Sequence, residues 1–148
     1  MKLNQISVFL ENNPGQLKLA CQRLAEANIN ILTLSLADTK QFGVLHLITP
    51  EWERAQTVFK QSGFIASVNE VLAVEVADRP GGLVEILNAI EEAGLNVEYM
   101  YAFTFGHQGK AALIFRFSDP DSAVAKLTAS GINIIDKVEL FARASLAG

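Results

Sequence analysis

Two stretches of the chain alternate apolar and polar positions, and each is followed by residues spaced for a helix. Apolar residues alternate in residues 6–10 and 72–76, which is the two-residue period of a β-strand. Behind each strand, apolar residues recur at i, i+3, i+4 and i+7, as on one face of a helix. They are Leu17, Ala20, Cys21 and Leu24 in the first stretch and Leu83, Ile86, Leu87 and Ile90 in the second. Asn28 and Gly94 follow, where a helix end favours a residue that tolerates positive φ.

The same order of elements continues in both stretches. β-Branched and aromatic residues predict a second strand, after which a turn, a third strand, a helix and a fourth strand follow. A capping residue with a nearby proline, Thr49-Pro50 or Ser118-Asp119-Pro120, starts each second helix, and a glycine, Gly63 or Gly131, follows its end. The predicted second strands are residues 29–37 and 95–105, the turns 38–42 and 106–110, the third strands 43–49 and 111–117, and the fourth strands 65–70 and 132–140.

The two stretches are an internal repeat. A shift of 66 residues places Pro14 on Pro80, Gly15 on Gly81 and Asn30 on Asn96, and after two extra residues near the second hairpin the shift becomes 68. Matching proline, glycine and asparagine positions at a fixed spacing indicate duplication. The sequence therefore predicts an α+β protein of two tandem βαββαβ units, residues 1–70 and 71–148. Each would have an antiparallel sheet with its helices on one face.

Composition narrows the classes of function. Half of the residues are apolar, 19% are charged and the net charge is −4, so clustered basic residues for nucleic acid are missing. The single cysteine, Cys21, allows no intrachain disulfide and no cysteine cage for a metal, and its helical pattern indicates a buried apolar role. The N-terminus lacks the apolar region of a signal peptide, and no apolar run reaches the ~18 residues that cross a bilayer. We expect a cytoplasmic protein that binds neither nucleic acid nor membrane.

Other proteins of this topology fit poorly. RNA recognition needs exposed aromatics on a basic sheet, and residues 110–117 give only a faint likeness. A metal chaperone needs two cysteines in the first loop, and neither copy has one there. An acylphosphatase-like enzyme needs an arginine in a Gly-rich first loop and an asparagine on a strand; Arg79 lies in the right loop, but the surrounding pattern is absent. His46 lies in a strand pattern and His107 at a hairpin tip, so both are expected to be structural. We therefore predict no catalytic residue, no metal ligand and no cofactor.

The first loops carry a family resemblance. ENNPGQL at residues 11–17 and ADRPGGL at residues 77–83 are followed by NINI and GLNV, at 28–31 and 94–97. This pattern resembles the ACT-domain family of amino-acid sensors, over essentially the whole chain twice. The resemblance implies two ferredoxin-like βαββαβ (ACT) domains in tandem, which regulate by binding a small amino acid where two such domains pair. Since the sequence shows no catalytic domain, the likeness is to free-standing tandem ACT proteins.

The chemistry of the loops supports this role. A Pro-Gly turn before a helix presents backbone N–H groups and the positive end of the helix dipole, which suit a carboxylate. Asn12 and Asp78 can accept hydrogen bonds from an ammonium group, and the resemblance implies that Asn30 and Asn96 reach the ligand across the domain pair. The predicted ligand-binding residues are Asn12, Asn13, Pro14, Gly15, Gln16, Leu17, Asn30, Ile31, Asp78, Arg79, Pro80, Gly81, Gly82, Leu83, Asn96 and Val97.

Structural alternatives exist for the same residues. Pro-Gly is a common turn, Asn12, Asn13 or Asp78 could cap the following helix, and both strand asparagines could bond locally. The copies also differ, because Asn12 and Gln16 stand where the second copy has Asp78 and Gly82, so the two sites should not be equivalent.

The second strands of the two copies differ in size. Alternation places aromatic side chains on one face in the second copy and small ones in the first, which could shape a ligand pocket or build an interface. The aromatic residues are Tyr99, Tyr101, Phe103 and Phe105, and their repeat partners include Thr33, Ser35 and Ala37.

Three functions follow in order of preference. The first is a non-catalytic sensor that binds an amino acid and passes the signal through a changed domain or subunit interface. The second is a regulatory subunit or scaffold of an amino-acid biosynthetic enzyme, acting mainly through protein contact. The third is an enzyme. Exposed sheet edges favour a homodimer.

Overall fold

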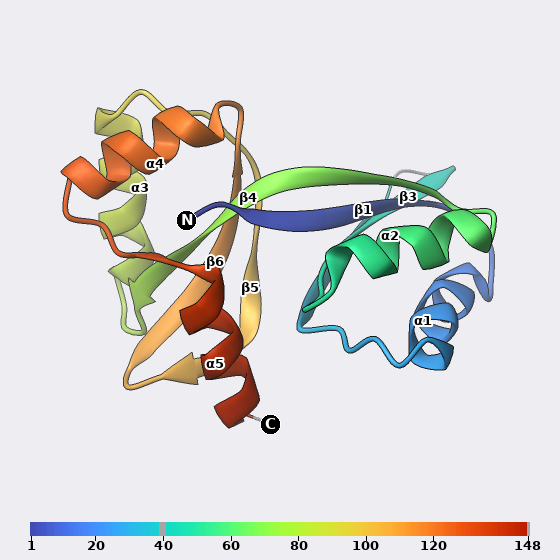
Figure 1. Cartoon of the computed structure of the whole chain (residues 1–148). Coiled ribbons are helices and arrows are strands. Elements are labelled where there is room, and N and C mark those ends of the chain that lie inside the picture. The colour runs from blue at the N-terminus through green and yellow to red at the C-terminus, as the bar shows by residue number, and fades with distance from the viewer. Residues whose placement is uncertain (39–40, 148) are drawn as a thin grey trace. The chain divides into compact units, whose positions relative to one another are not determined.

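The computed structural model describes residues 1–38 and 41–147, which form two compact units (Figure 1). The first unit is Asn4–Asn69, and the second combines Met1–Leu3 with the chain from Glu70 onwards. Each unit has its own cluster of buried apolar side chains. The chain is thus an α+β protein of two βαββαβ units, as predicted.

The first unit follows the predicted order of elements. They are β1 (Leu3–Glu11), α1 (Gln16–Glu26), β2 (Thr33–Asp38), β3 (Phe42–Ile48), α2 (Trp52–Gln61) and the start of β4 (Ile65–Ala77). Their strands lie in the order β2-β3-β1-β4, and β3 pairs antiparallel with both β1 and β2. The end of β1 and the start of α1 are therefore joined by only the Pro-Gly loop, at one end of a central strand.

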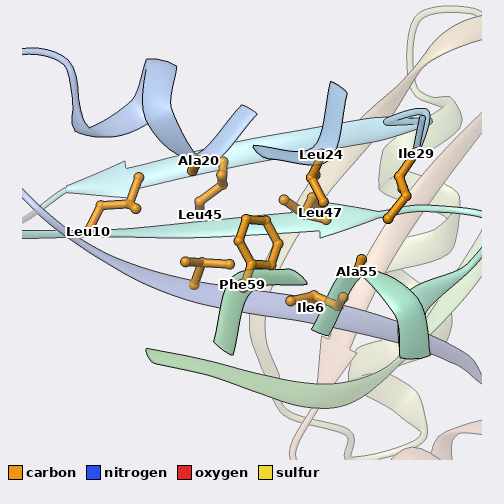
Figure 2. Close-up of a cluster of buried hydrophobic side chains, with 10 residues drawn as sticks. Ile6, Leu10, Ala20, Leu24, Ile29, Leu45, Leu47, Ala55 and Phe59 are labelled. Atoms are coloured by element: carbon orange, nitrogen blue, oxygen red, sulfur yellow. The ribbon is translucent and has the colours of Figure 1, made fainter. Parts of the chain in front are cut away.

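The core of the first unit lies between this sheet and its two helices. Alternation points Ile6, Val8 and Leu10 of β1 to one face, where they are buried. Figure 2 shows the side chain of Phe59, from α2, among residues of β1, β3 and α1. The ring of Phe64 meets that of Phe59 edge to face, with centroids 5.9 Å apart. This packing fixes α1 and α2 against the sheet and so positions the loop before α1.

The second unit repeats the arrangement and adds a helix. Its elements after β4 are α3 (Gly82–Glu92), β5 (Val97–His107), β6 (Lys110–Phe117), α4 (Pro120–Ala129), β7 (Ile134–Ile135) and α5 (Lys137–Ala147). The sheet runs β4-β6-β5, with β7 on the other side of β4. Leu72 and Val74 of β4, with the stacked rings of Phe115 and Phe117, form a core under α3 and α4.

The strand that joins the copies is continuous. The sequence predicted separate strands at 65–70 and 72–76 with hardly a linker, and the structure merges them into the 13-residue β4. Its first part belongs to the first unit and its second part to the second. No glycine or proline interrupts this segment, so the extended backbone continues through the boundary.

The fourth strand predicted at residues 132–140 is present but much shorter. Only Ile134 and Ile135 pair with β4, and a helix begins at Lys137. Asp136 caps that helix, because its Oδ1 accepts a hydrogen bond of 2.8 Å from the backbone N–H of Glu139. The segment KVELFARASLA is also rich in strong helix formers. It therefore forms a helix, although a short apolar run precedes it.

The added helix α5 lies on the sheet face opposite α3 and α4. Its Arg143 Nη2 is 2.9 Å from Glu75 Oε2, and Glu75 alternates along β4 with Val74 and Val76, which face the core. Burial alone would raise the pKa of the Glu75 carboxyl, but hydrogen bonds from Arg143 and Asn133 lower it. The repeated helices keep to one face, and α5 is an addition that contributes the buried Leu140 and this ion pair.

Smaller differences concern element boundaries. β2 begins four residues later than predicted and β5 two, while the turn of the second hairpin shortens to Gln108-Gly109. Part of the predicted turn at 38–42 lies outside the described residues. The positive φ expected after the first helices is confirmed, at 58° for Asn28 and 66° for Gly94.

One predicted helix cap is confirmed and the other is wrong. Asp119 Oδ1 accepts a 3.1 Å hydrogen bond from Ser122 N–H at the start of α4. Helix α2, by contrast, starts after Glu51 without a side-chain cap. Thr49 lies before it, and its buried Oγ1 has no hydrogen-bond partner in the described part of the chain.

Of the described helices, none is long and apolar enough to span a membrane.

Candidate functional site

Both Pro-Gly loops have the same backbone conformation. Gly15 and Gly81 adopt left-handed φ angles of 90° and 83°, which a residue with a Cβ rarely accepts. The backbone N–H of Gln16 donates to the carbonyl of Asn13 at 3.3 Å, and that of Gly82 donates to Arg79 at 3.0 Å. Each loop is therefore a tight turn that leads directly into a helix.

The two helices begin without a side-chain cap. The N-cap positions are Gly15 and Gly81, and neither helix receives a hydrogen bond from a capping side chain. The alternative that Asn12, Asn13 or Asp78 caps the helix is therefore wrong. N–H groups in the first turn of a helix have no acceptor within it, and the dipole makes this end positive. The loops thus offer donors to an anion.

The neighbours of the two turns differ in charge pairing. In the first copy, Asn13 Nδ2 donates to Glu11 Oε2 at 3.0 Å. In the second copy, Arg79 forms an ion pair with Glu85, in the first turn of α3, and also contacts the carbonyl of Pro80. The second loop therefore carries a cation that is already paired with its own helix.

The second loop is also packed more closely. A Cβ built on Gly82 would lie 2.0 Å from the carbonyl oxygen of Ala77, so only glycine fits there. The repeat partner in the first copy is Gln16, which has a long side chain. The predicted inequality of the two loops thus has a steric basis.

The first loop borders a small pocket. Its volume is 100 Å³, and it brings together four of the predicted binding residues. They are Asn12, Asn13, Gln16 and Leu17, and the remaining lining comes from Leu10, Glu11, Leu36 and Gly43.

A larger cleft of 360 Å³ adjoins the same loop. It shares Leu10, Glu11 and Gln16 with the small pocket, and its other lining residues were missed by sequence reasoning. They are Phe9, Leu19, Phe42, Ser62, Gly63, Phe64 and Ile65. The sequence feature that could have indicated this cleft is Phe9, an aromatic residue at a position of β1 that faces away from the core.

The asparagine elements lie elsewhere in each unit. Asn30 and Asn96 follow the ends of α1 and α3, whereas the Pro-Gly loops precede these helices. An 11-residue helix is about 16 Å long, so a unit does not bring its own loop and asparagine together. Asn96 Nδ2 donates to Ser118 Oγ at 2.9 Å, which is the local bonding considered as an alternative. Ile31 and Val97 contribute to the cores of their units.

The aromatic row of β5 is only partly regular. Tyr99 and Tyr101 pair with Arg116 and Ile114 of β6, on the face away from α3 and α4. The pairing register then shifts between Ala102 and Gly106, so the predicted alternation does not continue unchanged. The side chain of Phe105 lies outside the described residues. Burial raises the pKa of the Tyr101 hydroxyl.

His46 belongs to a polar cluster on the first sheet. Its Nδ1 is 2.9 Å from Ser7 Oγ and 3.2 Å from Gln5 Nε2, and Asn69 Nδ2 donates to the same Ser7 Oγ at 2.9 Å. Burial lowers the pKa of His46. These contacts fit the structural role that the sequence predicted. Across residues 1–38 and 41–147, no three His, Cys, Asp or Glu side chains are grouped to hold a metal ion.

Comparisons with solved structures give similar folds. Protein BT0572 from Bacteroides thetaiotaomicron is 28% identical, with a TM-score of 0.87 over 95% of this chain and 96% of that chain. The ligand-free regulatory subunit of aspartate kinase from Thermus thermophilus is 17% identical, with a TM-score of 0.64 over 86% and 90% of the two chains. The corresponding subunit from Thermus flavus is 18% identical, with a TM-score of 0.61 over 85% and 88%.

A search of curated protein sequences found no match. A family model described as "ACT domain pair" matches residues 1–144, nearly the whole chain. Together with the duplicated βαββαβ units and their Pro-Gly loops, this match shows that the chain belongs to the ACT domain pair family.

Proposed function

We propose that this chain is a non-catalytic regulatory protein that binds a free amino acid at the Pro-Gly loop of its first copy. The observation that carries the proposal is the uncapped start of α1 behind the left-handed Gly15, beside a pocket lined by Asn12 and Gln16. ACT domains are regulatory, which supports a role without catalysis.

The chemistry of a zwitterion fits this loop. N–H groups of the first turn of α1 can donate to the ligand carboxylate. The side-chain oxygens of Asn12 and Glu11 can accept from its ammonium group. Pro14 and Gly15 shape the turn, while Asn13 and Leu17 complete the wall of the pocket.

The second loop remains a proposed but poorer site. Asp78 could accept from an ammonium group, but Arg79 is paired with Glu85 and Gly82 abuts the backbone. Pro80, Gly81 and Leu83 repeat the turn of the first copy. That Asn30 and Asn96 reach a ligand of a neighbouring domain stays a prediction.

Binding would regulate by favouring one arrangement of domains or subunits. A ligand can do so only through different affinity for the two states. The proposal also includes two domains, residues 1–70 and 71–148, a cytoplasmic location and a homodimer. The exposed Leu34 and Leu36 of the edge strand β2 support the homodimer.

A second candidate is a regulatory subunit or scaffold that acts mainly by contact with an amino-acid biosynthetic enzyme. The fold likeness to the regulatory subunits of aspartate kinase favours it. Under this candidate, the protein would co-purify with an enzyme and change its activity without any amino acid present.

A thermal-shift screen of the twenty amino acids tests the first candidate. At a hundred times its Kd, a ligand stabilises the native state by about 2.7 kcal/mol, or a Tm rise of about 5 °C or more. Gly15→Val should remove the shift, because a branched side chain strains the left-handed turn.

Gly131→Val is the matched control, since Gly131 has a φ of 78° and equally open surroundings but lies in the second unit, outside both pockets of the first. It should lower the basal Tm about as much as Gly15→Val and keep the ligand shift. No shift with any amino acid at millimolar concentration would reject the sensor function.

A further inference from the structure

Three apolar residues that line the large cleft of the first copy match polar residues in the second copy. Phe9, Leu19 and Ile65 line it, and the repeat places Glu75, Glu85 and Asn133 at their positions. In the second copy, Glu75 is bonded to Arg143 and Asn133, and Glu85 is paired with Arg79. Polar residues therefore occupy these positions in the second copy, and each of them has a hydrogen-bond or ion-pair partner.

In the first copy these positions stay apolar, and two of them, together with Phe42, are open to solvent. The side chains of Phe9, Phe42 and Ile65 are 48%, 51% and 71% exposed, although they lie along one cleft. Single exposed apolar residues are ordinary, but several gathered in one concave surface mark a binding region. The volume of 360 Å³ also lies within the range of about 300–1,000 Å³ that small-molecule sites occupy.

Two helix ends of opposite electrostatic polarity border the cleft. Gln16 is the first residue of α1, where the dipole is positive. Ser62 and Gly63 follow the last residue of α2, where the dipole is negative, and Glu11 adds a carboxylate. An amino acid therefore fits in one orientation, with its carboxylate toward α1 and its ammonium group toward Glu11.

In this orientation the rest of the lining, which the ligand side chain meets, is mostly apolar. Phe9, Phe42 and Ile65 remain for it once the two charged groups are placed. We propose that the cleft selects amino acids with a large apolar side chain, aliphatic or aromatic, and that only the first copy does so. This inference rests on the proposed function and names its ligand class.

Isothermal titration calorimetry of the full chain tests the ligand class. Leucine, isoleucine, methionine and phenylalanine are titrated beside serine, threonine, aspartate and lysine. We expect the apolar group to bind at least about tenfold more tightly, since each buried methylene contributes about 0.8 kcal/mol. Ile65→Asn, which introduces the residue of the second copy, should raise the Kd for the apolar group about tenfold or more.

Val138→Asn is the matched control, because Val138 is an 80% exposed apolar residue on α5 of the second unit. It should leave the Kd unchanged, and unchanged melting curves without ligand should show that both variants fold. If polar amino acids bind as tightly, or if Ile65→Asn binds normally while Gly15→Val does not, the ligand class is wrong and the sensor function stands. Absence of binding by every amino acid would overturn both.

Discussion

Gly82 shows how a single position separates the two copies. Its repeat partner Gln16 lines both hollows of the first unit, whereas Gly82 leaves no room for even one carbon atom against Ala77. The position after the turn thus holds a long side chain in one copy and accepts only glycine in the other. The two loops therefore share the Pro-Gly turn and differ in the residue that follows it.

Gly82→Ala should destabilise the protein, because its Cβ would lie 2.0 Å from the Ala77 carbonyl oxygen. We expect a loss of about 1–3 kcal/mol in the free energy of unfolding, as for other overpacked positions. Urea denaturation followed by circular dichroism measures it. Gln16→Ala, the matched change in the first copy, should cost far less. Equal stability of the Gly82 variant and the unchanged chain would contradict the close packing.

His46 makes the stability of the protein depend on pH. Burial holds its folded pKa below the ordinary value of 6.5, so the unfolded chain binds protons more readily. The contribution of His46 is present above that ordinary value and is lost as pH falls through the folded pKa. The free energy of unfolding should therefore decrease between about pH 7 and pH 5. In His46→Gln, which cannot titrate, this slope should flatten, and an unchanged slope would assign it to other groups.

At the scale of elements, α5 is the part of the fold that the repeat could not predict. It has no partner in the first copy, and the sequence predicted residues 132–140 as the fourth strand that closes the second copy. The helix is held by contacts far apart in the sequence, which include the one from Arg143 to Glu75 across 68 residues. Local alternation and helical spacing predicted the repeated strands and helices well, because those elements bury one face each.

Arg143→Met tests the attachment of α5. The Arg143 side chain is only 10% exposed and that of Glu75 only 17%, so the change leaves a largely buried carboxylate without its cation. We expect a loss of about 2 kcal/mol in unfolding free energy. Arg23→Met removes an exposed pair with Glu26 and should cost less than about 1 kcal/mol. Equal losses in the two variants would show that α5 does not depend on Glu75.

The whole molecule is a pair of copies with diverged surfaces. The sequence predicted the duplication, the Pro-Gly loops and their inequality, because these depend on matching residues along the chain. It could not predict the cleft, since whether Phe9 and Ile65 stay uncovered depends on the helices that pack nearby. In the second copy the positions that match Phe9 and Leu19 are polar and paired, so the two copies differ in this region.

The continuous β4 has a consequence for how the protein can be divided. A cut after residue 70 would split one strand, and it would also separate Lys2 from Asp121, 2.7 Å away in the second unit. The first fragment would still contain the whole first unit, Asn4–Asn69, but the second would lack Met1–Leu3, which belong to the second unit. To move the second copy into another protein, Met1–Leu3 would therefore have to be joined to it, whereas the first copy is contained in residues 4–69.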